Sequence, residues 1–94
     1  MHVRFQDTAE ADLDAISDYF EDKSPRKLDR VLSAILTLTD KLALFPFMGR
    51  SGKVAGTREL SVPRTDYLIV YTLDDPHFID IIRIIHTRTN YPKH

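Results

Sequence analysis

The chain has 94 residues, a length that suits one domain, and its formal net charge is −1. The absence of cysteine excludes disulfides and thiolate metal sites and suits a reducing, cytoplasmic setting. No run of lysine and arginine exceeds two residues, so charge alone does not predict nucleic-acid binding, and neither a signal peptide nor a membrane-spanning helix is expected.

The first elements in chain order are a short strand and a surface helix. Val3 and Phe5 alternate with polar residues over 2–5, which predicts the strand. Asp7 is a candidate N-cap, and Glu10 follows three residues later, as in a capping box. Apolar residues then recur at helical spacing, at Ala9, Leu13, Ile16 and Phe20. We interpret the acidic residues of the other helix face as solvated: Asp12, Asp14 and Asp18.

A second helix follows after a short break. Ser24 is a good N-cap and Pro25 suits the first helical position. The apolar spacing then continues through Leu28, Val31, Leu32, Ile35, Leu38 and Leu42. Pro46 disfavours helix at Phe45 and ends the run. Because the link between the two helices is short, we expect an antiparallel helical hairpin.

The last third of the chain predicts a three-stranded antiparallel meander. A loop over 48–56 holds all three glycines, and short β-branched and aromatic runs follow at 57–62, 66–73 and 78–86. The N-terminal strand, the helical hairpin and the meander together predict an α+β fold with one twisted sheet.

The two turns of the meander suggest a register. Centring the strands on them places Arg58 and Asp80 on either side of Tyr71, which predicts a structural ion pair. The next cross-strand rows are Leu60 with Ile69 and Ile82, then Val62 with Tyr67 and Ile84. A slip of one residue would exchange the two faces of a strand.

This register leaves one face of the sheet without a cover. The helices are expected to pack on Leu60, Val62, Ile69, Tyr71, Phe78, Ile82 and Ile84. The opposite face carries Leu68, Val70, Ile79, Ile81 and Ile85, rimmed by Glu59, Ser61 and Arg83. Too few residues follow His86 to form a covering helix of normal length. An open apolar band normally marks an interaction site.

The order of several short motifs resembles the RelE/ParE superfamily, the toxins of type II toxin–antitoxin modules. These motifs are Arg58-Glu59-Leu60 after the glycine loop, Tyr67-Leu68-Ile69-Val70-Tyr71, and Ile85-His86-Thr87-Arg88. Leu44-Phe45-Pro46-Phe47-Met48-Gly49-Arg50 and Tyr91-Pro92 are similar to the ParE-like, plasmid-stabilisation branch. The resemblance spans nearly the whole chain and implies a single toxin domain over 1–94.

The resemblance implies one of two activities. RelE-like members cut messenger RNA in the ribosomal A site with basic and polar residues, whereas ParE-like members poison DNA gyrase. The positions that match the basic residues of RelE hold Glu59, Ser61, Leu68 and Thr87, and none is basic. This departure favours the ParE-like activity, which is binding to a protein target and requires no chemistry of the chain's own.

The resemblance also implies a cognate antitoxin, ParD-like or similar, as a partner in a hetero-oligomer. We expect no membrane association, no sequence-specific DNA binding by this chain, and no cofactor or metal. The histidines outside the strand motif, His2, His77 and His94, have no carboxylate cluster beside them to form a metal site. On the open face, antitoxin binding is predicted for Leu68, Val70, Ile81, Arg83 and Ile85.

Two alternatives stay open at this stage. The chain is a ribosome-dependent mRNA endoribonuclease if Arg83, His86, Arg88 and Tyr91 form a catalytic group. It is a non-toxic module if it only binds its antitoxin. We interpret His86 as a cap at the strand end and Arg88 as solvated.

Overall fold

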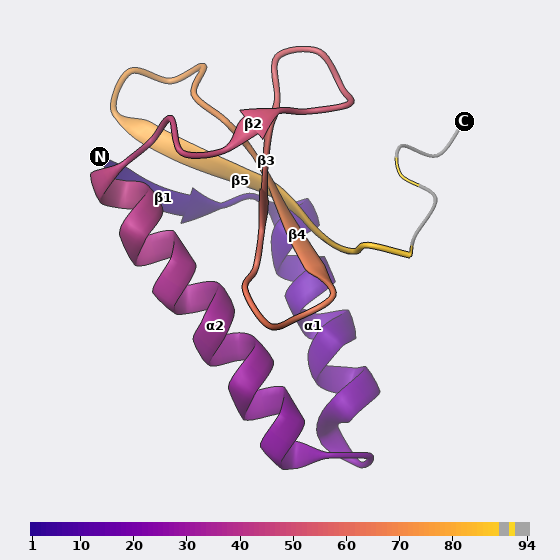
Figure 1. Ribbon diagram of the computed structural model, residues 1–94. Coiled ribbons are helices and arrows are strands. Elements are labelled where there is room, and N and C mark those ends of the chain that lie inside the picture. The colour runs from indigo at the N-terminus through magenta and orange to yellow at the C-terminus, as the bar shows by residue number, and fades with distance from the viewer. Residues whose placement is uncertain (89–90, 92–94) are drawn as a thin grey trace.

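The fold is one mixed β-sheet with a helical hairpin packed on it, as expected (Figure 1). The computed structural model describes residues 1–88 and 91, so Pro92 and His94 lie outside the described residues. The elements are β1 (His2–Phe5), α1 (Asp7–Glu21), α2 (Pro25–Leu44), β2 (Arg50–Ser51), β3 (Arg58–Ser61), β4 (Tyr67–Thr72) and β5 (Phe78–His86). The strand order is β1-β5-β4-β3-β2, with β1 parallel to β5 and the other pairs antiparallel. The predicted N-terminal strand is present, and β2 lies in a segment that was expected to be loop.

The predicted N-terminus of α2 is confirmed, whereas the predicted N-cap of α1 is not. The Ser24 hydroxyl oxygen accepts a hydrogen bond from the backbone N–H of Lys27 at 3.2 Å, and Pro25 opens α2. In α1 the predicted Asp7 cap is wrong: Gln6 is the N-cap residue, without a side-chain cap hydrogen bond. Its amide group instead donates to Asp80 on β5, so this side chain joins the start of α1 to the sheet.

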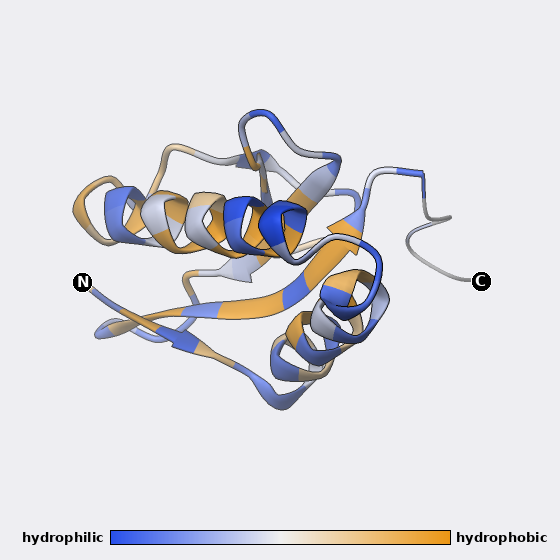
Figure 2. Cartoon of the chain, turned by 90° about the horizontal axis from the view of Figure 1, so that it is seen from below, coloured by the Kyte–Doolittle hydropathy of each residue, from blue (hydrophilic) through white to orange (hydrophobic). Residues whose placement is uncertain are grey.

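The main core lies between the hairpin and one face of the sheet. α1 and α2 contribute Ala9, Ile16, Phe20, Val31, Ile35, Leu38 and Leu42; the sheet contributes Ile69, Tyr71, Ile79, Ile81 and Ile84, and Val62 follows the end of β3. Figure 2 shows the hydrophobic sides of the helices turned toward the sheet and the hydrophilic sides turned outward. Burial of this continuous apolar stripe is the main force that holds the hairpin on the sheet.

A β-bulge in β5 overturns part of the predicted register. The β3–β4 register is confirmed, with Arg58 opposite Tyr71. Between β4 and β5, Val70 lies opposite Arg83 but Tyr71 lies opposite Ile81, so Ile82 is an extra residue on β5. From Arg83 to His86 the predicted partners are off by two residues, so the side chains stay on the predicted faces. From Phe78 to Ile81 they are off by one residue, so the side chains lie on the face opposite to the predicted one.

The exchange moves β5 side chains that were expected to lie on the open face. Ile79 and Ile81 are fully buried in the main core, whereas Ile82 belongs to the opposite face. The polar residues of β5, namely Asp80, Arg83 and His86, stand at every third position, so no strict alternation fixes which side chains face the helices.

The predicted ion pair between Arg58 and Asp80 is therefore wrong. Asp80 lies opposite Thr72, on the face away from the hairpin, where it pairs with Arg4 of the neighbouring β1. Arg58 shares the other face with Tyr71 and donates to the carbonyl oxygen of Gly49 at 2.7 Å.

The second face is closed by a small cluster of its own. Leu68, Val70 and Ile85 are buried there, with Ile82 and Tyr91 packed against them. The expectation that Leu68, Val70, Ile81 and Ile85 are more exposed than the residues of the helix face is wrong, since all four are below a tenth exposed.

Polar side chains of α1 cover the edge of β5 beyond the end of β1. The Thr8 hydroxyl donates to the carbonyl oxygen of Ile82, and the Asp12 carboxylate accepts the backbone N–H of Ile84 at 2.8 Å. Asp12 also accepts from Arg83 at 2.7 and 3.1 Å. The interpretation of Asp12 as a solvated residue is wrong: its carboxylate accepts the Ile84 N–H, which has no partner strand at this edge of β5 in the described part of the chain.

Asp80 gives the fold a predictable response to acid. The hydrogen bond from Arg4, aided by that from Gln6, holds the pKa of Asp80 below its usual range. A carboxyl group with a lowered pKa in the folded state contributes stability above its unfolded pKa, and this contribution is lost as the pH falls through the folded pKa.

We therefore expect Asp80→Asn to be less stable than the wild type at pH 7 and to approach it as the pH falls below about 4. Urea unfolding between these pH values measures the difference. Asp14→Asn, an exposed acidic position of α1, is the matched control and should follow the wild type throughout. A gap between Asp80→Asn and the wild type that stays constant with pH would contradict the assignment.

Among the described residues, no helix is long and apolar enough to cross a membrane.

Candidate functional site

The four residues considered for catalysis do not come together. His86 lies opposite Tyr67, on the hairpin side, and its ring meets the Tyr67 ring edge-on at 5.3 Å between centroids. Arg83 lies on the other face with the Tyr91 ring, 5.9 Å from its centroid. Because alternate residues of a strand point to opposite faces, Arg83 and His86, three residues apart in a regular part of β5, cannot act on one substrate atom.

His86 also has a structural role at the end of β5. Its Nδ1 atom accepts the backbone N–H of Arg88 at 3.2 Å, and its Nε2 atom lies 3.9 Å from the Asp66 carboxylate. This agrees with the interpretation of His86 as a strand-end cap. Arg88 is exposed.

The residues predicted to bind an antitoxin are divided by the bulge. Ile81 is fully buried in the main core. Leu68, Val70 and Ile85 form the second cluster, and Arg83 pairs with Asp12 across the edge of β5. The pairing raises the pKa of the Arg83 guanidinium, so its charge is held at the edge of this face.

A groove of about 1420 Å³ lies between the hairpin and the turn that joins β3 to β4; we call it the hairpin groove. Aromatic residues of α1 and β4 form one end of it, namely Tyr19, Phe20 and Tyr67. Its basic residues are Lys27, Arg30, Lys41, Arg64 and Arg88, against Asp29 and Asp66. The groove is thus positive although the chain as a whole carries a net charge of −1.

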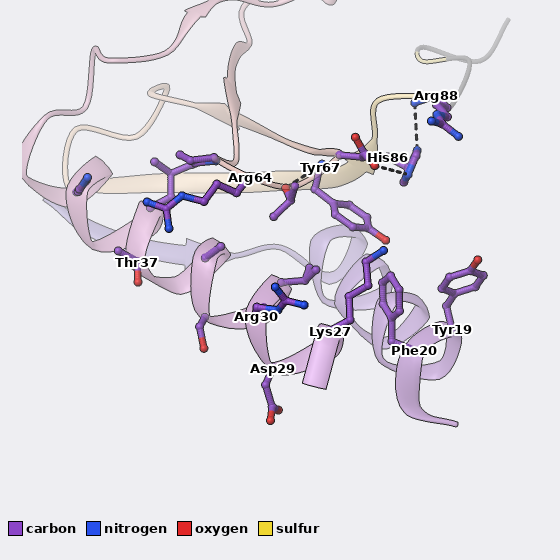
Figure 3. A pocket seen from close by; sticks show the side chains of 18 residues that line it. Tyr19, Phe20, Lys27, Asp29, Arg30, Thr37, Arg64, Tyr67, His86 and Arg88 are labelled. Carbon is purple, nitrogen blue, oxygen red and sulfur yellow. Dashed lines mark hydrogen bonds and ion pairs between the residues drawn. The ribbon is translucent and has the colours of Figure 1, made fainter. Parts of the chain in front are cut away.

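Figure 3 shows how these side chains are placed. Lys27 and Arg30 of α2 and Arg64 of the β3–β4 turn extend into the groove, whereas Asp29 points away from it. Lys27 also lies over the Phe20 ring, with its ammonium 5.6 Å from the centroid. A cleft that combines aromatic surface with cationic side chains suits an amphipathic segment with acidic residues.

Arg64 has an unusual backbone conformation for this position. Its φ is +61°, the single left-handed non-glycine residue among those that the structure describes. Pro63 precedes it, and the N–H of Thr65 donates to the carbonyl oxygen of Val62, as in a turn whose third residue is normally glycine. A left-handed arginine costs roughly 1 kcal/mol relative to glycine. Arg64 adopts this strained backbone conformation in the wall of the hairpin groove, which makes its side chain a candidate for binding a partner.

The hairpin groove was missed from the sequence because its residues come from both helices, the β3–β4 turn and the end of β5. The one signal available was the motif Pro63-Arg64 in a tight turn, where glycine is expected after proline. The pairing of Asp12 with Arg83 likewise had no signal, since Asp12 fits the pattern of an exposed helix face.

Three comparisons agree with this architecture. The chain matches the model of the ParE toxin of the type II toxin–antitoxin system, parDE, over residues 3–91. The chain belongs to this family. "Putative toxin Y4kP" of Sinorhizobium fredii is 33% identical over 81 residues, which cover 86% of this chain and 82% of that protein.

Two solved structures of toxin–antitoxin systems share the fold of this ParE-family chain. A chain of the chromosomal ParDE system from P. aeruginosa superposes with a TM-score of 0.79 at 27% identity, covering 92% of this chain and 95% of that one. A chain of the RelBE2 toxin–antitoxin complex from Mycobacterium tuberculosis gives a TM-score of 0.63 at 29% identity, covering 90% and 95%. The chain is thus a toxin-family member of the RelE/ParE superfamily, and an antitoxin is supported as its partner.

Proposed function

We propose that this chain is a ParE-like toxin that inhibits DNA gyrase in the cytoplasm and is neutralised by a cognate, ParD-like antitoxin. The observation that carries the proposal is the separation of the catalytic candidates, with Arg83 on one face and His86 on the other. Cleavage of RNA needs a proton shuttle and charge stabilisation at one point. Their separation favours a toxin that acts by binding a protein, and membership of the ParE family favours gyrase as that protein.

We assign the antitoxin to the hairpin groove. Its basic side chains, among them Arg30 and Arg64, would pair with acidic residues of the antitoxin, while Phe20 and Tyr67 offer apolar surface. The second face, with Leu68, Val70, Ile85 and the adjacent Arg83, is a further contact in this proposal. It ranks below the groove because Tyr91 and Ile82 already pack on that cluster.

Two assays with one variant test the proposed activity. We expect the wild type to inhibit supercoiling by purified DNA gyrase and to leave mRNA uncut on programmed ribosomes. We expect His86→Ala to stay within about threefold of the wild type in growth inhibition. Removal of a general acid or base would instead reduce the rate by about 10²–10⁴-fold and abolish toxicity.

The alternatives predict different results. If the wild type cuts mRNA on ribosomes and His86→Ala does not, the RelE-like endoribonuclease is the better assignment. A wild type that binds its antitoxin but inhibits neither growth, gyrase nor translation would be a non-toxic binding module. The wild type and His86→Ala must be compared at equal soluble expression, since His86 also caps the end of β5 and its loss could reduce folding.

A further inference from the structure

A second feature lies beyond the hairpin groove, at the C-terminal end of α2. Residues 44–48 expose a contiguous set of large apolar side chains: Leu44 is 74% exposed, Phe45 62%, Phe47 72% and Met48 41%. They surround a shallow hollow of about 500 Å³ with Pro46. Figure 2 shows this end of α2 as hydrophobic on the outside of the molecule. Apolar residues gathered in this way on a small domain mark an interaction surface.

The backbone of residues 44–48 is held by buried groups of the sheet. The hydroxyl of Tyr71, a fully buried side chain, donates to the carbonyl oxygen of Pro46 at 2.8 Å and accepts the N–H of Gly49 at 2.9 Å. Arg58 donates to the carbonyl oxygens of Gly49 and Phe47. Gly49 is needed at this point, because an added Cβ would lie 2.5 Å from the Tyr71 hydroxyl oxygen. The exposed aromatic rings therefore stand on a fixed backbone, and fixing a binding surface beforehand lowers the entropy cost of association.

The surrounding charges indicate the class of partner. Arg58 lies 5.0 Å from the Phe47 ring but donates its hydrogen bonds to carbonyl groups, and Arg50 lies 3.5 Å from the buried Glu59 carboxylate. These two cations are engaged within the protein, so the surface lacks the free cationic groove that tracks a nucleic-acid backbone. Exposed leucine, methionine and phenylalanine instead suit an apolar cleft in a folded protein.

A second copy of this chain is a poor occupant. The hairpin groove is large enough to accept the rings, but its wall is basic. Two exposed lysines, Lys41 and Lys53, also lie near residues 44–48 in the chain. Like charges on both surfaces oppose self-association and favour a partner whose cleft carries acidic groups.

We propose that residues 44–48 are the surface through which the toxin engages its target protein, with Phe45 and Phe47 inserted into an apolar cleft rimmed by acidic residues. This inference rests on the proposed function in one respect, that the target is a protein. Lys41 lines the hairpin groove and Leu44 lies about one helical turn further along α2. An antitoxin in the groove would thus reach the edge of this surface and block the target by its bulk.

The double variant Phe45→Ser/Phe47→Ser tests the inference, with Leu36→Ser as the matched control. Leu36 is 56% exposed on α2 and takes no part in the 44–48 surface. We expect the double variant to lose at least tenfold in growth inhibition and in binding to purified DNA gyrase. It should keep its affinity for the antitoxin within about twofold and its unfolding midpoint near that of the wild type. Leu36→Ser should match the wild type in all four measurements.

Several results would overturn the inference. One is a double variant as toxic as the wild type, and another is an equal loss in Leu36→Ser. Wild-type binding to single-stranded RNA that disappears in the double variant would assign the surface to nucleic acid, and a wild-type dimer that becomes a monomer would assign it to a second copy. If the wild type stops growth without binding gyrase, the gyrase assignment fails, while the growth comparison of the variants still decides the role of residues 44–48.

Discussion

Replacement of Asp12 by alanine is expected to lower the free energy of unfolding by about 2–3 kcal/mol. The carboxylate accepts two hydrogen bonds from Arg83 and one from the backbone N–H of Ile84, beside the bulge of β5. Its removal leaves the Ile84 amide without this partner and the Arg83 guanidinium without its counter-ion. Since the bulge sets which β5 residues enter the core, we also expect local opening there. Urea unfolding and amide hydrogen exchange at Ile84 measure the two effects.

Asp14→Ala and Arg83→Met are the controls for this prediction. Asp14 lies on the same helix but is exposed, so its replacement should change stability by less than about 0.5 kcal/mol. Arg83→Met should cost less than Asp12→Ala, because Asp12 still accepts the Ile84 amide. Equal stability of the Asp12 and Asp14 variants would show that the contact at the bulge contributes nothing measurable.

Exchange of Arg30 and Arg64 for glutamate together is expected to weaken antitoxin binding by about 100-fold, or about 2.7 kcal/mol. Both side chains extend into the hairpin groove, so the double reversal places negative charge where the acidic antitoxin segment is proposed to lie (Figure 3). Titration of the toxin with its cognate antitoxin measures the change. The loss should diminish at high salt, because screening weakens exposed charges. Arg26→Glu, a reversal at an exposed residue of α2 outside the groove, should leave the affinity near the wild-type value.

Arg64→Gly separates binding from folding at the same site. Glycine adopts the left-handed conformation without strain, so the variant should be as stable as the wild type or up to about 1 kcal/mol more stable. It should nevertheless bind the antitoxin more weakly, because it lacks the guanidinium. An unchanged affinity in this variant would argue that Arg64 occupies the turn for a reason unrelated to the antitoxin.

Local patterns in the sequence predicted the elements that are fixed by short-range physics. The apolar spacing through Val31, Ile35 and Leu42 indicated α2, and Ser24 with Pro25 gave its start. The β-branched runs gave the meander, and the order of short motifs gave the superfamily. Each of these features depends on residues within a few positions of one another, where helical or strand periodicity has a direct signature.

Tertiary contacts alone decided the faces of β5 and the site. Ile82 could be recognised as a bulge residue only once β4 lay opposite it, because the polar residues of β5 stand at every third position and give no strict alternation that fixes its faces. Asp12 has a structural role because α1 lies against the uncovered edge of β5. There Asp12 contacts Arg83 and Ile84, which are 71 and 72 residues away from it in the chain. The hairpin groove gathers side chains from four separate segments, and their charges add only where the fold brings them together. The sequence by itself determined the helices, the strands and the family, since these follow from local periodicity and motif order. Which side chains are buried, paired or presented to a partner depends on packing between distant segments, which has no period along the chain.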